Sequence, residues 1–483
     1  MPKVWESCIT LAALIGVLAI GIVIFGAAVH VPMFVGVCVA ALMALYLGHK
    51  WDSIEKMMMD GIYKALQSIC ILIIVGILIG VWINAGVVPT MIYYGLKIMH
   101  PAIFFIAAVL ICSITSLATG TSWGTMGTMG VALMGIGFGL DMNPAMTAGA
   151  ILSGAYFGDK MSPLSDTTNL APAMAGTDVI AHVKAMMIPT VVTYAITLVV
   201  FGVFGAMQYH GGEADMSRVT EFAAALNAAE GGVFNINPIL LLPPVIVIVA
   251  MKMPAIPGIT LGIFAGAVLG LIFQPNACDL GTLFSFGMDG YAFSDEMRAV
   301  LQSSLTEDTY NTMVELLEKG GIMNMMNSVA MTIIAMMFGG IMEGTHQLEV
   351  VVNKLKKLAK GPAGLVTLTE ITCVISNMTM PEQYISIVVP GRMYAEEYRK
   401  MGLHPAVLSS ALEGAGTVTS ALVPWNTCGV FISDTLGIGV AQYGIYAIFN
   451  WLMPIINWLC VLIGWTLKDL AGKPFKKSKK VAQ

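Results

Sequence analysis

The chain has 483 residues, of which 57% are hydrophobic and 11% charged, and its formal net charge is −5. Soluble domains carry about 25% charged residues, so this composition excludes an ordinary soluble protein and indicates one embedded in a bilayer. No stretch resembles a phosphate-binding P-loop, which argues against ATP-driven transport by this chain alone.

Apolar runs recur along the chain, and a helix needs about 20 residues to cross the hydrocarbon core of a membrane. The runs cover 8–29, 31–48, 66–86, 101–119, 185–207, 236–251, 256–273, 326–342, 363–376 and 441–466. Several are shorter than a full span, which favours broken or re-entrant segments. The first run is too long for a secretory leader and is expected to remain as a span. The pattern predicts an all-α polytopic membrane protein.

The distribution of lysine predicts which segments face the cytoplasm, because basic residues accumulate on that side whereas acids are weak signals. Residues 349–362 carry four lysines against Glu349, a net charge of +3, and the tail 468–483 carries six lysines against one aspartate, a net of +5. The segments 208–235 and 274–320 have net charges of −3 and −6. We expect 349–362, the tail and the lysine-containing loop 49–64 inside, and the two acidic segments outside.

These placements constrain the number of crossings. An odd number must lie between the inside loop 49–64 and the outside segment 208–235, and this holds if 101–140 is a hairpin that enters and leaves by one face. The same argument makes 363–400 a second re-entrant hairpin, because Arg392, Arg399 and Lys400 return it to the cytoplasm. The prediction is about ten transmembrane helices plus two re-entrant hairpins, with both termini cytoplasmic.

The two halves of the chain share patterns at an offset of about 260 residues: 80–101 resembles 339–362, and 142–169 resembles 402–427. Because the predicted topology turns the halves in opposite directions, we interpret them as inverted repeats, which place a binding site near the midplane. The predicted domains are 1–207 (hairpin 101–140, broken helix 147–173), the extracellular linker 208–235, the second repeat 236–467 (hairpin 363–400, broken helix 405–437) and the cytoplasmic tail 468–483.

Four polar stretches, 115–127, 158–169, 376–383 and 414–429, interrupt these apolar halves, and each mixes Gly or Pro with Ser, Thr, Asn or an acid. Such backbone survives at membrane depth only around a cavity or an ion. Hydroxyl, carbonyl and carboxylate oxygens suit a hard cation, so these stretches supply the predicted Na⁺ ligands. In the first half the predicted ligands are Thr119, Ser122, Asp159, Ser162, Ser165, Asp166, Thr167 and Asn169, and in the second half Glu382, Thr417, Thr419, Asn426 and Thr427.

Charged side chains within spans are functional candidates because they are costly to insert. Lys160 is expected to offset Asp159, its neighbour in the chain, which ranks Asp166 first of the two aspartates. Either acid would instead be an ordinary loop residue if 147–173 were two short helices. The predicted coupling residues are Asp166, Glu343, Glu382 and Glu413. The predicted substrate-binding residues are Thr121, Trp123, Asn169, Asn377, Thr379, Arg392, Glu413, Trp425 and Asn426.

Two of these residues have a second interpretation. Arg392 would meet a carboxylate substrate as a planar fork or would serve as a positive-inside anchor. Glu343, at the end of an apolar run, suits an interface position as well as coupling.

The stretches "GDKMSPLSDTTN" (158–169), "PTMIYYGLKI" (89–98), "QYISIVVPGRMY" (383–394), "AGTVTSALVPWNTCG" (415–429) and "YAIFNWLMPI" (446–455) resemble the NhaC family of Na⁺/H⁺ antiporters and related carriers, within the ion transporter superfamily. The resemblance implies an elevator mechanism, a scaffold that forms a homodimer, and cations held where a hairpin tip meets a broken helix. It also implies malate–lactate exchange or amino-acid transport in some members. The chain departs from the family at Glu382, often Asp there, and at Gly414, where many members have an acid.

The predicted function is Na⁺-coupled secondary transport in a bacterial inner membrane, exchanging Na⁺ with H⁺ and carrying a small organic acid such as malate or lactate. The alternative is a Na⁺-coupled amino-acid symporter. A channel would need a continuous pore with rings of like side chains. An enzyme would need a set of catalytic or metal-ligating residues. The seven histidines are scattered and the eight cysteines lack metal-ligand spacing, so neither group offers such a set. No cofactor other than the coupling ion Na⁺, and no nucleic acid partner, is expected.

Overall fold

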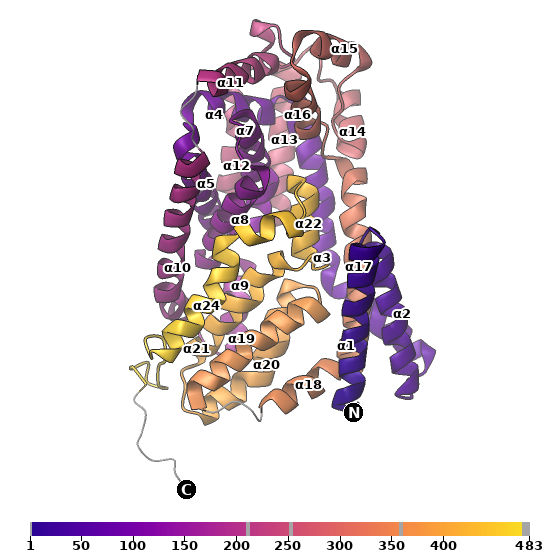
Figure 1. Cartoon of the computed structure of the whole chain (residues 1–483), viewed down its shortest axis with the longest axis vertical. Coiled ribbons are helices and arrows are strands. Elements are labelled where there is room, and N and C mark those ends of the chain that lie inside the picture. The colour runs from indigo at the N-terminus through magenta and orange to yellow at the C-terminus, as the bar shows by residue number, and fades with distance from the viewer. Residues whose placement is uncertain (1, 209–212, 251–254, 357–360, 476–483) are drawn as a thin grey trace.

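The computed structural model describes residues 2–208, 213–250, 255–356 and 361–475 (Figure 1). Within these ranges the chain is helical, and its extended pairings are isolated bridges such as that between Leu403 and Asp469. Parts of the predicted segments 208–235 and 349–362, and the second half (476–483) of the basic tail 468–483, lie outside the described residues. The all-α architecture predicted from the sequence is confirmed.

Five helices in the described ranges are long and apolar enough to cross a membrane. They are α3 (Trp51–Asn84), the helix Pro101–Thr119 that contains α5 (Phe104–Thr119), α10 (Val179–Gln208), the stretch Ile256–Phe273 of α13 (Ala255–Phe273), and α17 (Gly321–Gly344). Two bent pairs raise the number to seven: Pro405–Leu422 with Thr427–Leu436, bent by 48°, and Val440–Tyr446 with Ile448–Leu462, bent by 52°. Apolar helices α1 (Val4–Ala19) and α2 (His30–Tyr46) are shorter. The count of ten spans stays a prediction.

The remaining helices are shorter connections and halves of interrupted segments. They are α4 (Val87–Ile98), α6 (Ser122–Thr125), α7 (Val131–Gly139), α8 (Pro144–Met161), α9 (Asp166–Ala175), α11 (Glu213–Leu226), α12 (Leu242–Ala250), α14 (Leu280–Asp289), α15 (Asp295–Ser304), α16 (Glu307–Leu317), α18 (Gln347–Lys356), α19 (Gly361–Thr379), α20 (Gln383–Lys400), α21 (Pro405–Ala411), α22 (Thr427–Leu436), α23 (Val440–Tyr443) and α24 (Ile448–Leu462).

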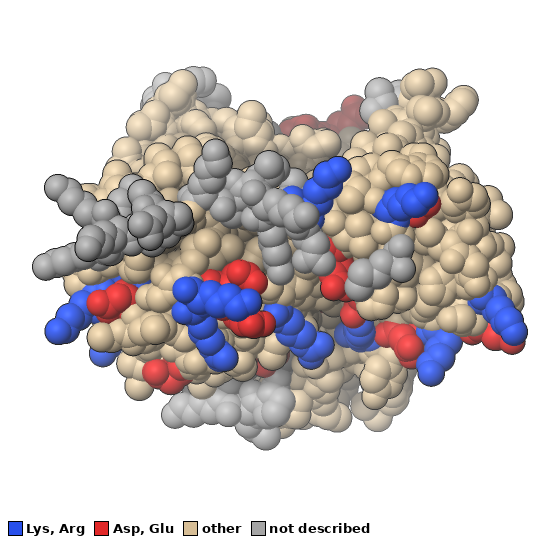
Figure 2. All heavy atoms as spheres, turned by 90° about the horizontal axis from the view of Figure 1, so that it is seen from below, with Lys and Arg blue, Asp and Glu red and all other residues tan. Residues whose placement is uncertain are grey.

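The two ends of the molecule differ in charge. The acidic segments that contain α11, α15 and α16 lie at the upper end, whereas α1 begins and α18 lies at the lower end (Figure 1). Seen from below, this lower face shows Lys and Arg side chains in a band with Asp and Glu interspersed (Figure 2). The segments that the sequence assigned to opposite sides of the membrane are thus at opposite ends of the structure. Their assignment to the cytoplasm or the exterior stays a prediction.

Two close helix pairs organise the interior. Helix α3 packs along α17, and α5 packs along α8. The second pair approaches closely because α8 has small residues on the facing side: a Cβ at Gly158 would lie only 2.4 Å from the carbonyl oxygen of Ser113. Small residues allow such backbone contact between membrane helices.

Four helix breaks interrupt the polar stretches predicted from the sequence. Gly120 ends α5 with φ of 70°, and the Thr121 side chain caps α6 by accepting from the backbone N–H of Gly124. Pro163 holds Ser162 extended and ends α8, after which the Ser165 side chain caps α9. In the second half the breaks lie at 380–382, before α20, and at 423–426, before α22. The breaks fall inside the predicted hairpins and broken helices, whose interpretation as inverted repeats stays a prediction.

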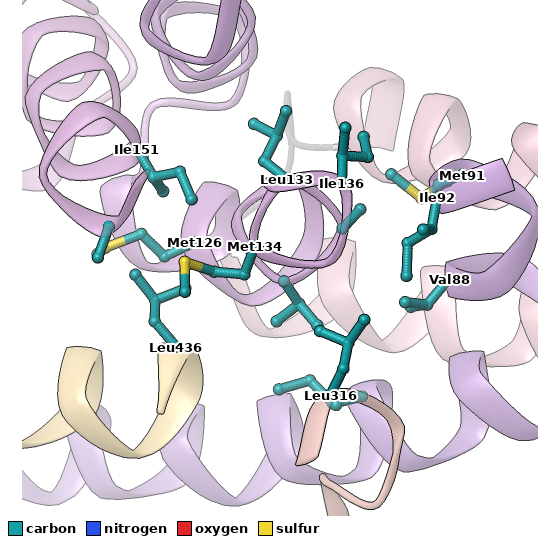
Figure 3. Close-up of a cluster of buried hydrophobic side chains, with 14 of the residues drawn as sticks. Val88, Met91, Ile92, Met126, Leu133, Met134, Ile136, Ile151, Leu316 and Leu436 are labelled. Carbon is teal, nitrogen blue, oxygen red and sulfur yellow. The ribbon is translucent and has the colours of Figure 1, made fainter. Parts of the chain in front are cut away.

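Part of the apolar core forms around α7, which lies between helices from both halves of the chain (Figure 3). Ile136 lies on the side of α4, and Met134 lies on the side of α22. The labelled side chains of this cluster come from α4 (Val88, Met91, Ile92), the stretch Met126–Gly130, α7, α8 (Ile151), α16 (Leu316) and α22 (Leu436). This packing fixes α7, and with it the hairpin segment that leads back to α6.

Candidate functional site

A small polar cavity of about 70 Å³ lies where the first two helix breaks meet. Its walls come from the turn that joins α5 to α6, from the end of α8 and from the start of α9, with α3 and α20 closing the sides. The lining residues are Ser68, Ile71, Thr119, Gly120, Thr121, Ser122, Trp123, Asp159, Leu164, Ser165, Asp166, Thr167, Gln383 and Tyr384. Eight of them were predicted as site residues from the sequence.

Gly120 brings the two breaks into contact. A Cβ at this position would lie 2.7 Å from the carbonyl carbon of Leu164, and its positive φ disfavours other residues. The turn after α5 and the turn before α9 therefore pack directly on each other. This contact places hydroxyl groups from one turn opposite the carboxylates of the other.

Asp159 is the buried acid of the cavity, with 5% of its surface exposed. Its Oδ2 accepts a hydrogen bond of 2.7 Å from the Ser122 hydroxyl, and the Ser165 hydroxyl also interacts with the carboxylate. The predicted pairing with Lys160 is not formed. Adjacent side chains in a helix point about 100° apart, so Lys160 is directed away from Asp159. Among the described residues the Nζ atom of Lys160 has no hydrogen-bond partner.

Asp166 lines the same cavity but belongs to its exposed side. It is the first residue of α9, where the positive end of the helix dipole favours a carboxylate. The side chain of Tyr384, on α20, interacts with it. The two aspartates thus flank one cavity, Asp159 in the interior and Asp166 at the more open side.

The cavity suits a hard, partly dehydrated monovalent cation. Its polar lining is made of hydroxyl, amide and carboxylate groups, which are the ligands of hard cations. Drug-sized ligands occupy clefts of about 300–1,000 Å³, so a space of about 70 Å³ fits an ion or a few waters. In the described part of the chain, no group of three or more His, Cys, Asp or Glu side chains forms a site for a metal ion.

The predicted residues of the second half form a hydrogen-bonded cluster beside this cavity. The Asn377 side chain donates to the carbonyl oxygen of Gly416 at 2.7 Å and to the Thr419 hydroxyl at 2.9 Å. Asn426 donates to the backbone oxygen of Asn377 at 3.2 Å. The hydroxyl of Thr427 donates to Glu382 Oε2 at 2.8 Å. The cluster therefore ties the break at 380–382 to the break at 423–426.

Some polar atoms of this cluster have unused hydrogen-bonding capacity. Oε1 of Glu382 is buried without a hydrogen-bond partner among the described residues, and the buried hydroxyl of Thr417 lies beside the Glu413 carboxylate without forming a full hydrogen bond. Buried polar atoms normally have partners, so such atoms indicate a place for a bound ion, a proton or water. Gln383 and Tyr384, which follow Glu382, line the cavity of the first half and connect the two sets.

Glu413 links the halves directly. It is fully buried, and its Oε1 accepts from the hydroxyl of Thr167 at 3.2 Å. Thr167 itself lines the cavity, whereas Oε2 of Glu413 has no partner in the described residues. A carboxylate of the second half thus reaches the wall of the first-half cavity.

Other predicted residues lie away from the cavity. Arg392 and Glu343 line a separate hollow of about 390 Å³, where Glu343 also pairs with Lys64 at 2.5 Å. Four further residues bond to nearby backbone carbonyls: Ser162 to Leu117, Asn169 to Pro163 and Ser165, Thr379 to Ile375 and Trp425 to Met378. The structure therefore does not bring them into the cation cavity.

Trp123 forms one wall of the cavity and stacks on Phe431 of α22, with ring centroids 4.4 Å apart. The sequence predicted Trp123 as a substrate-binding residue. Its stacking partner lies in the second half, so the ring also holds the two halves together.

Sequence reasoning missed several residues of this region. Ser68 and Tyr384 line the cavity from helices distant in sequence, and Glu370 is a buried carboxylate of α19. Tyr384 stands two residues after Glu382, which was a usable signal. Ser68 and Glu370 sit within ordinary-looking helices, where only the packing of distant segments reveals their position.

The fold and the cavity define a multi-pass membrane protein with an ion-sized polar site at the contact of interrupted helices. A sequence profile described as "Na+/H+ antiporter family" matches residues 3–206 and 154–465. The chain belongs to this family of Na⁺-coupled antiporters, and the resemblance seen in its motifs is confirmed.

Named relatives span nearly the same length. The chain is 36% identical over 454 residues to a malate-2H⁺/Na⁺-lactate antiporter of Bacillus subtilis (strain 168), which covers 94% of the chain and 92% of the relative. It is 35% identical to the Na⁺/H⁺ antiporter NhaC of Alkalihalophilus pseudofirmus, over 88% of each chain. It is 32% identical to the arginine/ornithine antiporter ArcD of Halobacterium salinarum, over 94% of the chain and 90% of the relative.

Proposed function

We propose that this protein exchanges Na⁺ for H⁺ across a bacterial plasma membrane and carries a small organic acid, such as malate or lactate, in the same cycle. The observation that carries the proposal is the cavity between the breaks, in which Asp159 and Asp166 face hydroxyl groups. The relative that shares 36% of its residues supports the choice of an organic acid.

The cavity explains how one set of side chains would handle Na⁺. Backbone freed at helix breaks and the oxygens of Ser122, Ser165 and Thr167 would replace the water around the ion. Asp159 would neutralise its charge in a site with little solvent. Helix N-termini are positive, so the carboxylates at this site also offset the starts of α6 and α9.

The organic acid needs more space than the cation cavity provides. The hollow that contains Arg392 has about 390 Å³ and one guanidinium group, which suits a carboxylate through paired hydrogen bonds. We propose Arg392 as the carboxylate partner in that hollow. An amino acid is the second candidate substrate, supported by the arginine/ornithine antiporter among the relatives.

The mechanism that we propose is an elevator within a homodimer. Helices α3 and α17 would form part of the scaffold, and the interrupted helices around the cavity would move as the transport domain. The direct contact of Gly120 with Leu164 supports movement of both turns as one unit.

The test uses the purified full-length protein in liposomes that contain a pH-sensitive dye. An imposed Na⁺ gradient should drive proton movement, and the same gradient of K⁺ should not. Asp159→Asn should lower the apparent Na⁺ affinity by about tenfold or more, corresponding to ~1.4 kcal/mol. Asp60→Asn, an exposed acid of α3 outside the cavity, is the matched control and should behave as wild type.

Labelled malate, lactate and arginine then distinguish the substrates in the same liposomes. Uptake of one acid that depends on the Na⁺ gradient supports organic-acid exchange, and uptake of arginine supports the alternative. Equal proton movement under a Na⁺ gradient and under a K⁺ gradient would contradict the proposed function.

A further inference from the structure

Lys160 is a buried cation that the proposed Na⁺ site does not use. It is fully buried, and its Nζ atom has no hydrogen-bond partner in the described part of the chain. Isolated buried charges are costly, so a buried ammonium group requires counter-charges. The carboxylates that act on it are Glu413 and Glu370.

The helices that carry these three groups are packed together. Helix α24 contacts α8, which carries Lys160, and α19, which carries Glu370. The segment Leu412–Thr417, which carries Glu413, contacts both α19 and α24. One lysine thus lies among two carboxylates from separate elements. With all three ionised the cluster has an excess negative charge, which low-dielectric surroundings disfavour.

Glu370 is the carboxylate of this cluster that faces outward. Its Oε1 accepts from the Asn457 side chain at 2.6 Å, and only 5% of the residue is exposed. It lines an apolar groove of about 420 Å³ between α19 and α24, formed with residues such as Ile371 and Trp458. None of the described residues lines both this groove and the cation cavity.

We propose that Glu370 is a proton-binding site distinct from the Na⁺ cavity, and that Lys160 couples the two sites. The proposal rests on the proposed Na⁺/H⁺ exchange and adds where the proton is held. Without Na⁺, Lys160 compensates Glu413, and Glu370 carries a proton. When Na⁺ binds at Asp159 beside Thr167, the ion is shared by the carboxylates of Asp159 and Glu413. The Lys160 ammonium then shifts toward Glu370, and the Glu370 proton leaves. One cation enters as one proton departs, so charge balances.

Among the described residues, Lys160 of α8 acts on Glu370 electrostatically, and Cys373 of α19 and Tyr398 of α20 interact with it. Glu413 of the segment 412–417 and the buried His182 interact with Lys160. The cysteine and tyrosine are buried and uncharged at neutral pH. Lys160 and Glu413 keep their charges in this scheme, and Glu370 is the group that gains and loses the proton.

The first test does not depend on transport. Dicyclohexylcarbodiimide, an apolar reagent that adds to protonated carboxyl groups, should modify Glu370 through the groove, as mapped by mass spectrometry. Modification should fall when Na⁺ is added, and Glu370→Gln should remove it. Modification of Glu370 that is absent, or that Na⁺ leaves unchanged, contradicts the proposal.

The second test measures the link between Na⁺ and pH. In wild type the apparent Na⁺ affinity should fall by about tenfold from alkaline to acid pH, an ordinary size for coupled sites. In Glu370→Gln the protein should still bind Na⁺, seen as thermal stabilisation, but with an affinity that depends less on pH, because only protons that compete for Asp159 and Asp166 then oppose Na⁺. Glu396→Gln, an exposed glutamate on α20 paired with Lys400, is the matched control.

The outcomes separate the two proposals. Wild-type protein that moves no protons with Na⁺ contradicts the proposed function, whereas wild-type coupling that persists unchanged in Glu370→Gln contradicts only the proton site. Should Glu370→Gln fail to fold because it leaves Lys160 less compensated, the double variant Lys160→Gln/Glu370→Gln removes both charges. That variant should bind Na⁺ with the same reduced pH dependence, and the full wild-type pH dependence in it would also overturn the inference.

Discussion

The two aspartates of the cavity differ in burial, with Asp159 in the interior and Asp166 at the exposed side, which we call the entrance. Asp159 is buried and bonded to Ser122, whereas Asp166 begins α9 on the exposed side of the same cavity. From the sequence, Asp166 was the preferred cation-site candidate of the two aspartates, because Lys160 was expected to offset the charge of Asp159. The carboxylates that interact electrostatically with Lys160 are instead Glu413 and Glu370, so Asp159 stays available for a cation.

Replacing Asp166 by Asn should therefore weaken Na⁺ capture more than it weakens the fold. We expect the apparent Na⁺ affinity to fall by about tenfold, ~1.4 kcal/mol, because the entrance loses its negative charge. Stability should fall by less than about 1 kcal/mol, the size of a helix-dipole contribution. Titration of Na⁺ against thermal stability measures both quantities. An unchanged Na⁺ affinity would remove Asp166 from the site.

The residues of the site were predictable where composition alone exposes them. Gly120, Pro163 and Ser165 indicate helix breaks. Acidic residues between apolar runs indicate a functional site, because a charge is costly to insert into the membrane. The residue types do not indicate the direction in which a side chain points. Lys160 and Asp159 are adjacent in the chain yet face different groups, and Arg392 lies in another hollow than Asp159. These relations arise from packing between segments that are hundreds of residues apart.

At the scale of elements, the contact of the two first-half turns decides the shape of the cavity. Gly120 has a positive φ, and its missing side chain leaves room for the backbone of Leu164. The hairpin turn and the broken helix therefore depend on each other, although 44 residues separate them. The sequence predicted both breaks but did not predict that they touch.

Gly120→Ala tests this contact. A positive φ costs a non-glycine residue about 1–2 kcal/mol, and the clash with Leu164 should add about 1–3 kcal/mol. Gly48→Ala is the matched control, because Gly48 also has a positive φ, of 89°, but has nothing within 4 Å of the added Cβ. Thermal unfolding of both variants in detergent should show the larger loss for Gly120→Ala, together with weakened Na⁺ stabilisation. Equal losses in the two variants would show that the contact contributes nothing.

The whole molecule has an upper end with acidic helices and a lower end where α1, α3 and α19 begin (Figure 1). The lysine distribution predicts that the lower end faces the cytoplasm. Charge patterning predicted which segments share an end, because they must share an aqueous phase. The number of crossings was less predictable, since interrupted and short helices blur the length criterion.

Cysteine accessibility checks this orientation. In protein without its eight native cysteines, Ser303→Cys on α15 should react with a membrane-impermeant maleimide added to intact cells. Ser53→Cys at the start of α3 should react only in inverted vesicles. Both serines are exposed, so a difference reports the side of the membrane rather than burial. The reverse labelling pattern would invert the proposed topology.

The crowding of acids around Lys160 also has an electrical consequence. Asp159, Glu370, Glu382 and Glu413 are buried in this region against one lysine. Moving a charge through the full membrane potential costs about 2.3 kcal/mol per 100 mV. Displacement of the cluster with its carboxylates ionised would be opposed or driven by voltage, whereas each Na⁺ or proton bound to them would reduce the charge that moves. The number of ions bound to these carboxylates would then set how strongly the resting potential drives the cycle.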